Sequence, residues 1–283
     1  MGTLERAINK IQRSAQKQSA AVEPGRPPVA APLAAPPGGV VARRKLAVTR
    51  GRLVANGLMA PKEHEVAIAE QYRGIKRPLI ANALGTHAAE VRFRNVIAVM
   101  SALPGEGKTF SSFNLAVSIA QEEDRPIVLV DADVVKPHLT EALGTQAEPG
   151  LLDLLTNKTL ALADVLMVTD LDGLLFLPCG RSESNAHDLL ASRRMETIVS
   201  ELAGSDGAIV VFDSPPLLLT NEARVLAALA GQILLVVAAS RTPQAKVLEA
   251  AGLIDERKAL NLVLNGASGE HNDYRYGSVH GGK

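Results

Sequence analysis

The segment from Asn95 to Ala120 constrains the fold of this chain more than any other stretch. It reads NVIAVMSALPGEGKTFSSFNLAVSIA: an apolar, β-branched run, a break at residues 104–107, and a helical pattern that begins at Lys108. This pattern predicts a buried strand, a glycine-rich loop and a helix. In such an arrangement the amides of the loop and of the first helical turn have no backbone partners, so they can bind a polyphosphate. The segment therefore predicts an α/β fold with a phosphate site after a strand.

The loop matches the pattern G-x-x-x-x-G-K-[ST] except at its first position, where Ala102 replaces glycine. In this pattern the lysine reaches the outer phosphates and the next hydroxyl completes a Mg²⁺ shell. We therefore predict a P-loop NTPase with a mostly parallel sheet flanked by helices, with ATP and Mg²⁺ as cofactors, Lys108 as a catalytic residue and Thr109 as a metal ligand. The predicted nucleotide-binding residues are Pro104, Gly105, Glu106, Gly107, Lys108, Thr109, Phe110 and Asn265. The amide of Asn265, at the end of the last predicted strand, either contacts the adenine or caps a turn.

Three aspartates follow two further apolar runs. Residues 127–130 lead into Asp131 and Asp133, and residues 208–212 lead into Asp213. Because ligands bind at the carboxyl ends of parallel strands, we expect these carboxylates beside the phosphate loop. We predict that Asp131 and Asp133 are catalytic and that Asp133 and Asp213 bind the metal. Which of the first two accepts a proton stays open.

Composition divides the rest of the chain. We expect an amphipathic helix in residues 1–18, a Pro/Ala-rich linker in 19–61, the P-loop domain in 62–266 and a flexible polar tail in 267–283. The tail holds Tyr274 and Tyr276, two of the three tyrosines. Aromatic residues have no packing role in a disordered polar tail, so both are predicted to be modified, unless the tail docks on its own domain.

Charge and cysteine content exclude several classes of protein. Lys plus Arg equals Asp plus Glu, at 30 each, so no overall basic field attracts nucleic acid. The single cysteine, Cys179, excludes an internal disulfide and is expected to be packed rather than nucleophilic. The longest uncharged apolar run, around residues 225–240, is too short to span a membrane. We therefore predict a cytoplasmic protein that a partner recruits to the inner face of the cytoplasmic membrane.

A helical pattern over residues 63–83 carries Glu70, Arg73 and Lys76 at positions i, i+3 and i+6. This spacing predicts that the three charges share roughly one helix face. Such a face is either solvated or paired with another subunit.

As a set, these motifs resemble the bacterial tyrosine kinases of exopolysaccharide assembly. The set comprises the Ala-Leu-Pro-Gly-Glu-Gly-Lys-Thr loop, the strand ends Asp-Ala-Asp and Asp-Ser-Pro-Pro, the Glu-x-x-Arg-x-x-Lys helix and the two tail tyrosines. It is most similar to the exosortase-associated tyrosine autokinase branch, over about residues 62–283. The resemblance implies transfer of the γ-phosphoryl group of ATP to the tail tyrosines of a neighbouring subunit, in a homo-oligomer such as a ring. It also implies activation by a membrane protein of the polysaccharide co-polymerase type.

Position by position, the resemblance assigns roles to the motifs. Lys108 and Thr109 match the Walker A residues, Asp131 and Asp133 the Walker A′ pair, Asp213 the Walker B residue, Glu70, Arg73 and Lys76 the oligomer interface, and Tyr274 and Tyr276 the phosphoacceptors. The chain departs from the family at Val135, where an arginine is usual, and at Lys76, which is usually arginine.

Two other functions remain open. One is a switch ATPase of the MinD/ParA kind, which carries a signature lysine five residues before the P-loop lysine; here that position is Leu103. The other is a non-catalytic ATP-binding scaffold for a membrane partner.

Overall fold

The computed structural model describes residues 42–85, 91–121, 125–204 and 207–267. Within them the chain forms an eight-stranded sheet with the order β1-β4-β5-β3-β6-β2-β7-β8. Neighbouring strands are parallel except β4 and β5. The strands are β1 (Arg44–Leu46), β2 (Val96–Ser101), β3 (Ile127–Asp131), β4 (Met167–Thr169), β5 (Leu174–Leu177), β6 (Ile209–Asp213), β7 (Gln232–Ala238) and β8 (Ala259–Asn265).

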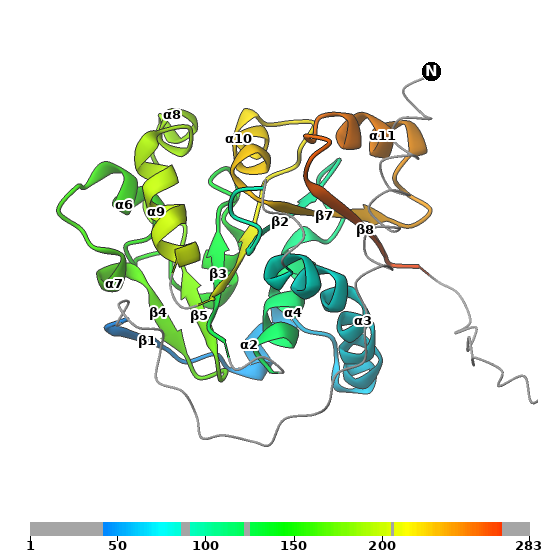
Figure 1. The fold of residues 1–283 in the computed structure, drawn as a ribbon. Helices are drawn as coiled ribbons and strands as arrows, with labels where there is room; N and C mark the ends of the chain where they lie inside the picture. The colour runs from blue at the N-terminus through cyan, green and yellow to red at the C-terminus, as the bar shows by residue number, and fades with distance from the viewer. Residues whose placement is uncertain (1–41, 86–90, 122–124, 205–206, 268–283) are drawn as a thin grey trace, which may run out of the picture.

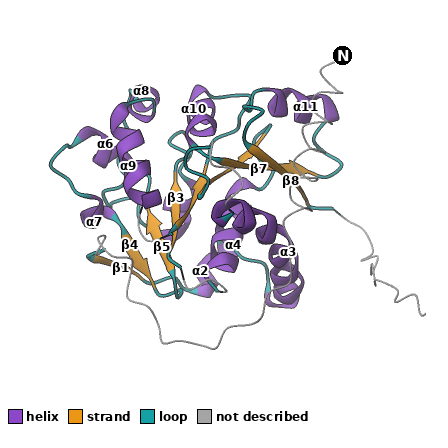
Figure 2. Ribbon diagram, viewed as in Figure 1, coloured by secondary structure: helices purple, strands orange, loops and turns teal. Residues whose placement is uncertain are grey.

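Helices cover both faces of this sheet (Figures 1 and 2). They are α2 (Arg50–Ala55), α3 (Glu65–Leu84), α4 (Lys108–Ala120), α5 (His138–Leu143), α6 (Leu151–Thr156), α7 (Leu162–Val165), α8 (Ala186–Leu190), α9 (Arg193–Gly204), α10 (Asn221–Leu229) and α11 (Gln244–Gly252), with a 3₁₀ turn at Lys62–His64. The predicted α/β fold with a mostly parallel sheet is confirmed.

Two hydrophobic clusters lie on opposite faces of the sheet. Along β2, Ala98 and Met100 belong to the cluster that α6 to α11 cover, whereas Ile97 and Val99 belong to the cluster under α2 to α5. Successive side chains of a strand point to opposite faces, so a strand buried on both sides needs apolar residues at every position. The apolar runs of the sequence therefore become the central strands, and the residues that follow them lie at the carboxyl edge of the sheet.

The linker predicted for residues 19–61 ends earlier than expected. Residues 42–61 contain β1, which pairs with β4, and α2, whose Leu53 is buried together with Leu58. Arg52 Nε donates a hydrogen bond to the carbonyl of Ala142 in α5, at 2.8 Å. The boundary was wrong because the Pro/Ala bias stops near residue 42, and a short apolar segment that follows it packs on the domain.

Several predicted features lie outside the described residues. These are the amphipathic helix of residues 1–18, the part of the linker before residue 42, and Tyr274 and Tyr276. Among the residues that the structure does describe, no helix has the length and apolar character needed to cross a membrane.

Candidate functional site

The phosphate-binding loop joins β2 to α4 and depends on two glycines with left-handed backbone. Gly105 has φ +73° and Gly107 has φ +92°. A Cβ atom on Gly107 would lie 2.0 Å from Nδ2 of Asn265, so this position needs glycine for space as well as for conformation. Ala102 at the first position of the motif is fully buried against the core. The loop therefore keeps the glycines that its geometry requires and lacks only the first one.

Glu106 fixes the loop from inside. Its side chain is buried, and Oε2 accepts a hydrogen bond from the backbone N–H of Leu103 at 2.6 Å. Oε1 accepts a hydrogen bond from the hydroxyl of Thr242 in the segment between β7 and α11. Arg241, in the same segment, donates to the carbonyl of Gly105 at 2.6 Å. These contacts hold the loop in one conformation before nucleotide binds.

Asn265, predicted to contact adenine or to cap a turn, contacts the phosphate-binding loop, and its contact with adenine stays a prediction. Its Nδ2 donates a hydrogen bond to the carbonyl of Glu106 at 2.9 Å. Sequence reasoning missed Arg241 and Thr242, because they lie 136 residues from the loop residues they bind and belong to no motif.

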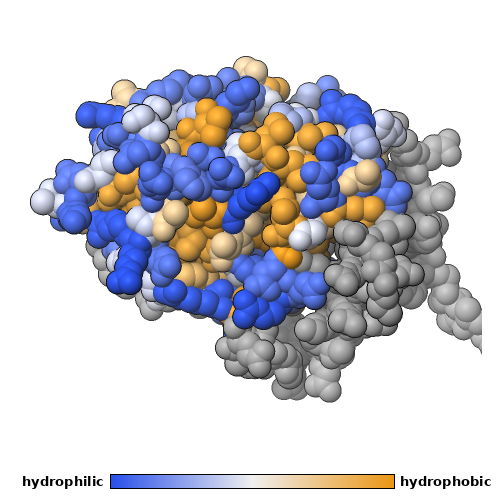
Figure 3. Space-filling model, turned by 90° about the horizontal axis from the view of Figure 1, so that it is seen from above, coloured by the Kyte–Doolittle hydropathy of each residue, from blue (hydrophilic) through white to orange (hydrophobic). Residues whose placement is uncertain are grey.

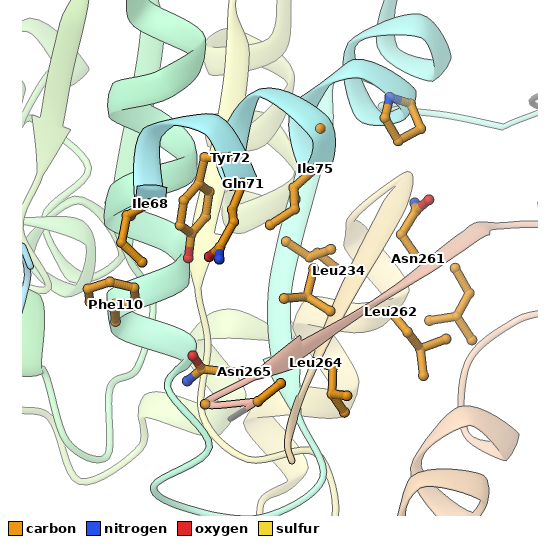
Figure 4. Close-up of a pocket in the computed structure, with 16 residues that line it drawn as sticks. Ile68, Gln71, Tyr72, Ile75, Phe110, Leu234, Asn261, Leu262, Leu264 and Asn265 are labelled. Carbon is orange, nitrogen blue, oxygen red and sulfur yellow. The ribbon is translucent and has the colours of Figure 1, made fainter. Parts of the chain in front are cut away.

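Asn265 and Phe110 also line a groove of about 890 Å³ between α3 and β8 (Figure 4). Ile68, Tyr72 and Ile75 extend into it from α3, and the ring of Tyr72 stands edge-on to that of Phe110 with 6.3 Å between centroids. The groove is predominantly apolar and begins beside the phosphate-binding loop. Two predicted nucleotide-binding residues thus line a groove whose volume exceeds that of a nucleobase.

The three predicted aspartates meet at the carboxyl edge of adjacent strands. Asp131 on β3 and Asp213 on β6 are register partners, and the N–H of Ala132 donates to the carbonyl of Asp213 at 2.9 Å. The side chains of Asp131, Asp133 and Asp213 are all buried, as is Lys108. The structure therefore brings together the groups that the sequence placed on separate segments.

Burial dominates the electrostatics of these aspartates. It raises the pKa of Asp131 well above its ordinary value, and the charge of Asp213 raises it further, against hydrogen bonds from Thr140. It raises the pKa of Asp213 to about 7, against the opposing effect of Lys108. It also raises the pKa of Asp133, against a backbone hydrogen bond from Lys136. Groups perturbed by both burial and specific charges are typical of functional sites.

The carboxylate of Asp213 has the surroundings of a cation ligand. Both of its oxygens are buried, and within the described residues neither meets the distance and angle of a normal hydrogen bond, although the hydroxyls of Thr109 and Ser112 lie close enough to lower its pKa. Thr109, whose hydroxyl lies close enough to lower the pKa of Asp213, is the other predicted ligand on this side. Carboxylate and hydroxyl oxygens suit Mg²⁺, which is held by few protein ligands together with phosphate oxygens. The surroundings of Asp213 and Thr109 thus fit Mg²⁺, and Asp133 as a further ligand stays a prediction.

The three charges of α3 do not share one face. Glu70 and Arg73 form an exposed ion pair, with 62% and 51% of their side-chain surfaces accessible. Lys76 is 1% exposed, and its Nζ donates to the carbonyl of Ser118 at the end of α4. Six residues turn a helix by about 600°, so Lys76 lies about 120° around the axis from Glu70. The expectation of one charged face is corrected: Lys76 is enclosed in its own subunit, and an interface role for Glu70 and Arg73 stays a prediction.

Cys179 is packed, as the sequence indicates. It is buried at the end of β5, and burial raises the pKa of its thiol. Two apolar side chains are exposed in the segments that follow two of the aspartate-bearing strands: Val135 after β3, at 52%, and Leu219 after β6, at 61%. Apolar surface also gathers between polar residues on the face seen from above in Figure 3.

The chain was compared with family models, with individual proteins and with solved structures. No family model matches it, but individual proteins do. The tyrosine-protein kinase YwqD of Bacillus subtilis is 29% identical over 231 residues, which cover 80% of this chain and 93% of YwqD. CapB of Staphylococcus aureus, provisionally named a tyrosine-protein kinase, is 30% identical over 200 residues, 70% of this chain and 84% of CapB.

A solved structure agrees with these relatives. The kinase domain of VpsO superposes with a TM-score of 0.60 at 28% identity, over 74% of this chain and all of that domain. Other relatives are longer, and this chain spans about a quarter of their length. The finer assignment to the exosortase-associated branch stays a prediction. With the phosphate loop and the three aspartates in place, and with CapB matched over most of its length, the chain belongs to the bacterial tyrosine kinase family.

Proposed function

We propose that this protein is an ATP-dependent tyrosine kinase that phosphorylates Tyr274 and Tyr276 of a neighbouring copy in a homo-oligomer. The observation that carries the proposal is the register pairing of Asp131 with Asp213 beside Lys108 and the phosphate-binding loop. The chain is related to tyrosine kinases and carries two tyrosines in its C-terminal segment, so an NTPase site of this kind would have both a donor and an acceptor for phosphoryl transfer.

Positioning and neutralisation of charge supply most of the catalysis of phosphoryl transfer. The loop amides and Lys108 bind the β- and γ-phosphates, and Phe110 and Asn265 bound the groove that takes the base. Thr109, Asp133 and Asp213 would hold Mg²⁺, which would supply positive charge next to the phosphate oxygens. The tyrosine oxygen attacks the γ-phosphorus, and the bond to the β–γ bridging oxygen breaks with its electron pair leaving on ADP.

The tyrosine hydroxyl must lose its proton during this step, because its ordinary pKa is near 10. We assign the proton to Asp131. Its pKa is raised by burial and by Asp213, so it accepts a proton more readily than an exposed carboxylate does. In this assignment Asp133 binds the metal ion and does not accept the proton of the tyrosine.

We extend the proposal to the cellular setting of the protein. A kinase of this family would act in the cytoplasm and regulate exopolysaccharide synthesis or export, recruited to the inner face of the cytoplasmic membrane by a co-polymerase type protein that activates it. Glu70 and Arg73, exposed on α3, are the residues proposed to contact the neighbouring subunit.

Intact-mass spectrometry of the full chain after incubation with Mg²⁺-ATP tests the proposal. We expect added phosphates that map to Tyr274 and Tyr276 and that are lost in Lys108→Met. Release of phosphate without any added mass would favour a switch ATPase. Nucleotide binding with neither signal, also in the presence of a co-polymerase partner, would favour a non-catalytic scaffold.

A further inference from the structure

Thr140, on α5, binds the carboxylate of Asp131 through two hydrogen bonds. Its backbone N–H donates to Oδ2 of Asp131 at 2.8 Å, and its hydroxyl donates to the same oxygen at 2.7 Å. The side chain is 2% exposed, so water does not compete for these bonds. Two short hydrogen bonds from one buried residue fix the orientation of the Asp131 carboxyl group.

The direction of the hydroxyl proton is set by a second contact. The N–H of Cys179, at the end of β5, donates to Oγ1 of Thr140 at 2.9 Å. Because Oγ1 already accepts this bond, its own proton is directed to Asp131, which offers an acceptor at 2.7 Å. A side chain on α5 thus couples the ends of β3 and β5.

The two oxygens of Asp131 are therefore not equivalent. Oδ2 accepts both bonds from Thr140, whereas Oδ1 accepts only a longer one, 3.3 Å from the N–H of Asp133, among the described contacts. An oxygen that already accepts two short bonds has little capacity to take another proton. Oδ1 is then the atom with capacity for a substrate proton.

We propose that Thr140 is a positioning residue for phosphoryl transfer, which holds Oδ2 of Asp131 so that Oδ1 takes the proton of the acceptor tyrosine. This inference rests on the proposed kinase function and extends it to a residue that lies nine positions beyond Asp131. Thr140 touches neither ATP nor the tyrosine in this account; it acts through Asp131.

The chain offers a matched control in Thr145. This residue is also a buried threonine, 1% exposed, and its N–H and hydroxyl donate to the carbonyl of Thr140 at 2.9 and 3.2 Å. Thr145→Val removes a buried hydroxyl next to α5 without touching Asp131. Thr140→Val removes the hydroxyl bond to Asp131 and keeps the backbone one, at nearly the same side-chain volume.

The test is the initial rate of tail phosphorylation in the full-length protein, followed by intact mass over a range of ATP concentrations. For Thr140→Val we expect the rate at saturating ATP to fall at least about tenfold and the half-saturating ATP concentration to change less than about twofold, since only the step after binding is affected. Thr140→Ser, which retains the hydroxyl, should stay within about threefold of the wild type, and Thr145→Val should match the wild type.

A wild-type rate in Thr140→Val, or an equal loss in Thr145→Val, would overturn the assignment. If Thr140→Val does not fold, Thr140→Ser and Thr140→Ala decide the question, because they differ only in the hydroxyl; equal rates in this pair would overturn it as well. A wild-type protein that adds no phosphate would instead overturn the kinase function, and the role of Thr140 with it.

Discussion

The side-chain amide of Asn265 donates a hydrogen bond to the carbonyl of Glu106 at 2.9 Å, and so ties the end of β8 to the centre of the phosphate-binding loop. The two residues are 159 positions apart in the chain. The conformation of the nucleotide site thus depends on the last strand of the domain.

This contact predicts a strict requirement for glycine at position 107. A Cβ there would lie 2.0 Å from Nδ2 of Asn265, and a φ of +92° is unfavourable for alanine. Gly107→Ala should therefore weaken binding of Mg²⁺-ADP by at least about tenfold, as a loss of about 1.4 kcal/mol or more implies. Gly204→Ala, where a Cβ would meet nothing within 4 Å, is the control. Isothermal titration calorimetry measures both, and equal affinities would contradict the packing described here.

The stability of the nucleotide-free protein should depend on pH through Asp213. Its pKa is raised to about 7 in the folded protein, so the folded state retains a proton that the unfolded state, with an ordinary pKa of about 3.9, has lost. The stabilising contribution is fully present below pH about 4 and is lost as the pH rises through about 7.

Asp213→Asn removes this dependence. Between pH 5 and 8 the wild type should lose on the order of 3 kcal/mol of unfolding free energy that the variant does not lose. At pH 8, Mg²⁺-ADP should raise the melting temperature of the wild type far more than that of the variant. Urea unfolding across this pH range gives the comparison, and parallel pH profiles for the two proteins would refute the electrostatic description of the site.

Two charges on α3 should behave differently although they are three residues apart. Lys76 is enclosed and binds the carboxyl end of α4, so Lys76→Ala should destabilise the monomer by about 2–4 kcal/mol through the cavity and the lost hydrogen bond. Arg73→Ala breaks an exposed ion pair and should cost less than about 1 kcal/mol.

The effect of Arg73→Ala on oligomerisation should be large, although its effect on stability is small. If Glu70 and Arg73 form the subunit interface, Arg73→Ala shifts the protein to the monomer in analytical ultracentrifugation with its unfolding free energy nearly unchanged. An Arg73→Ala protein that assembles like the wild type would remove this residue from the interface.

Sequence patterns predicted the features that depend on residues close together in the chain. The strand, loop and helix of residues 95–120 follow from hydrophobic periodicity and glycine placement, and the positions of Asp131 and Asp213 follow because parallel strands end at one edge. Such features depend on residues that are neighbours in the sequence and on the rule that parallel strands end at one edge of the sheet, so they can be predicted without a structure.

The features that escaped prediction depend on tertiary contacts. Nothing near Thr140 in the sequence indicates that it binds Asp131, and Thr242 meets Glu106 only because β7 lies beside β2. The burial of Lys76 could have been suspected from helix geometry, since a spacing of six residues does not return to the same face. The packing of α2 on the domain was not predicted, because only a few apolar residues signal it and they directly follow the Pro/Ala-rich segment.

A mixing experiment tests the central claim most directly. The donor is a full-length chain with Tyr274→Phe and Tyr276→Phe, which has an intact nucleotide site and no proposed acceptor. The other partner is Lys108→Met, which retains both tyrosines and lacks the lysine of the site. After incubation with Mg²⁺-ATP, intact mass spectrometry should find phosphate on Tyr274 and Tyr276 of the Lys108→Met chain and none on either protein alone. An unmodified Lys108→Met chain in the mixture, under conditions in which the donor binds ATP and the two variants assemble, would contradict phosphorylation between subunits.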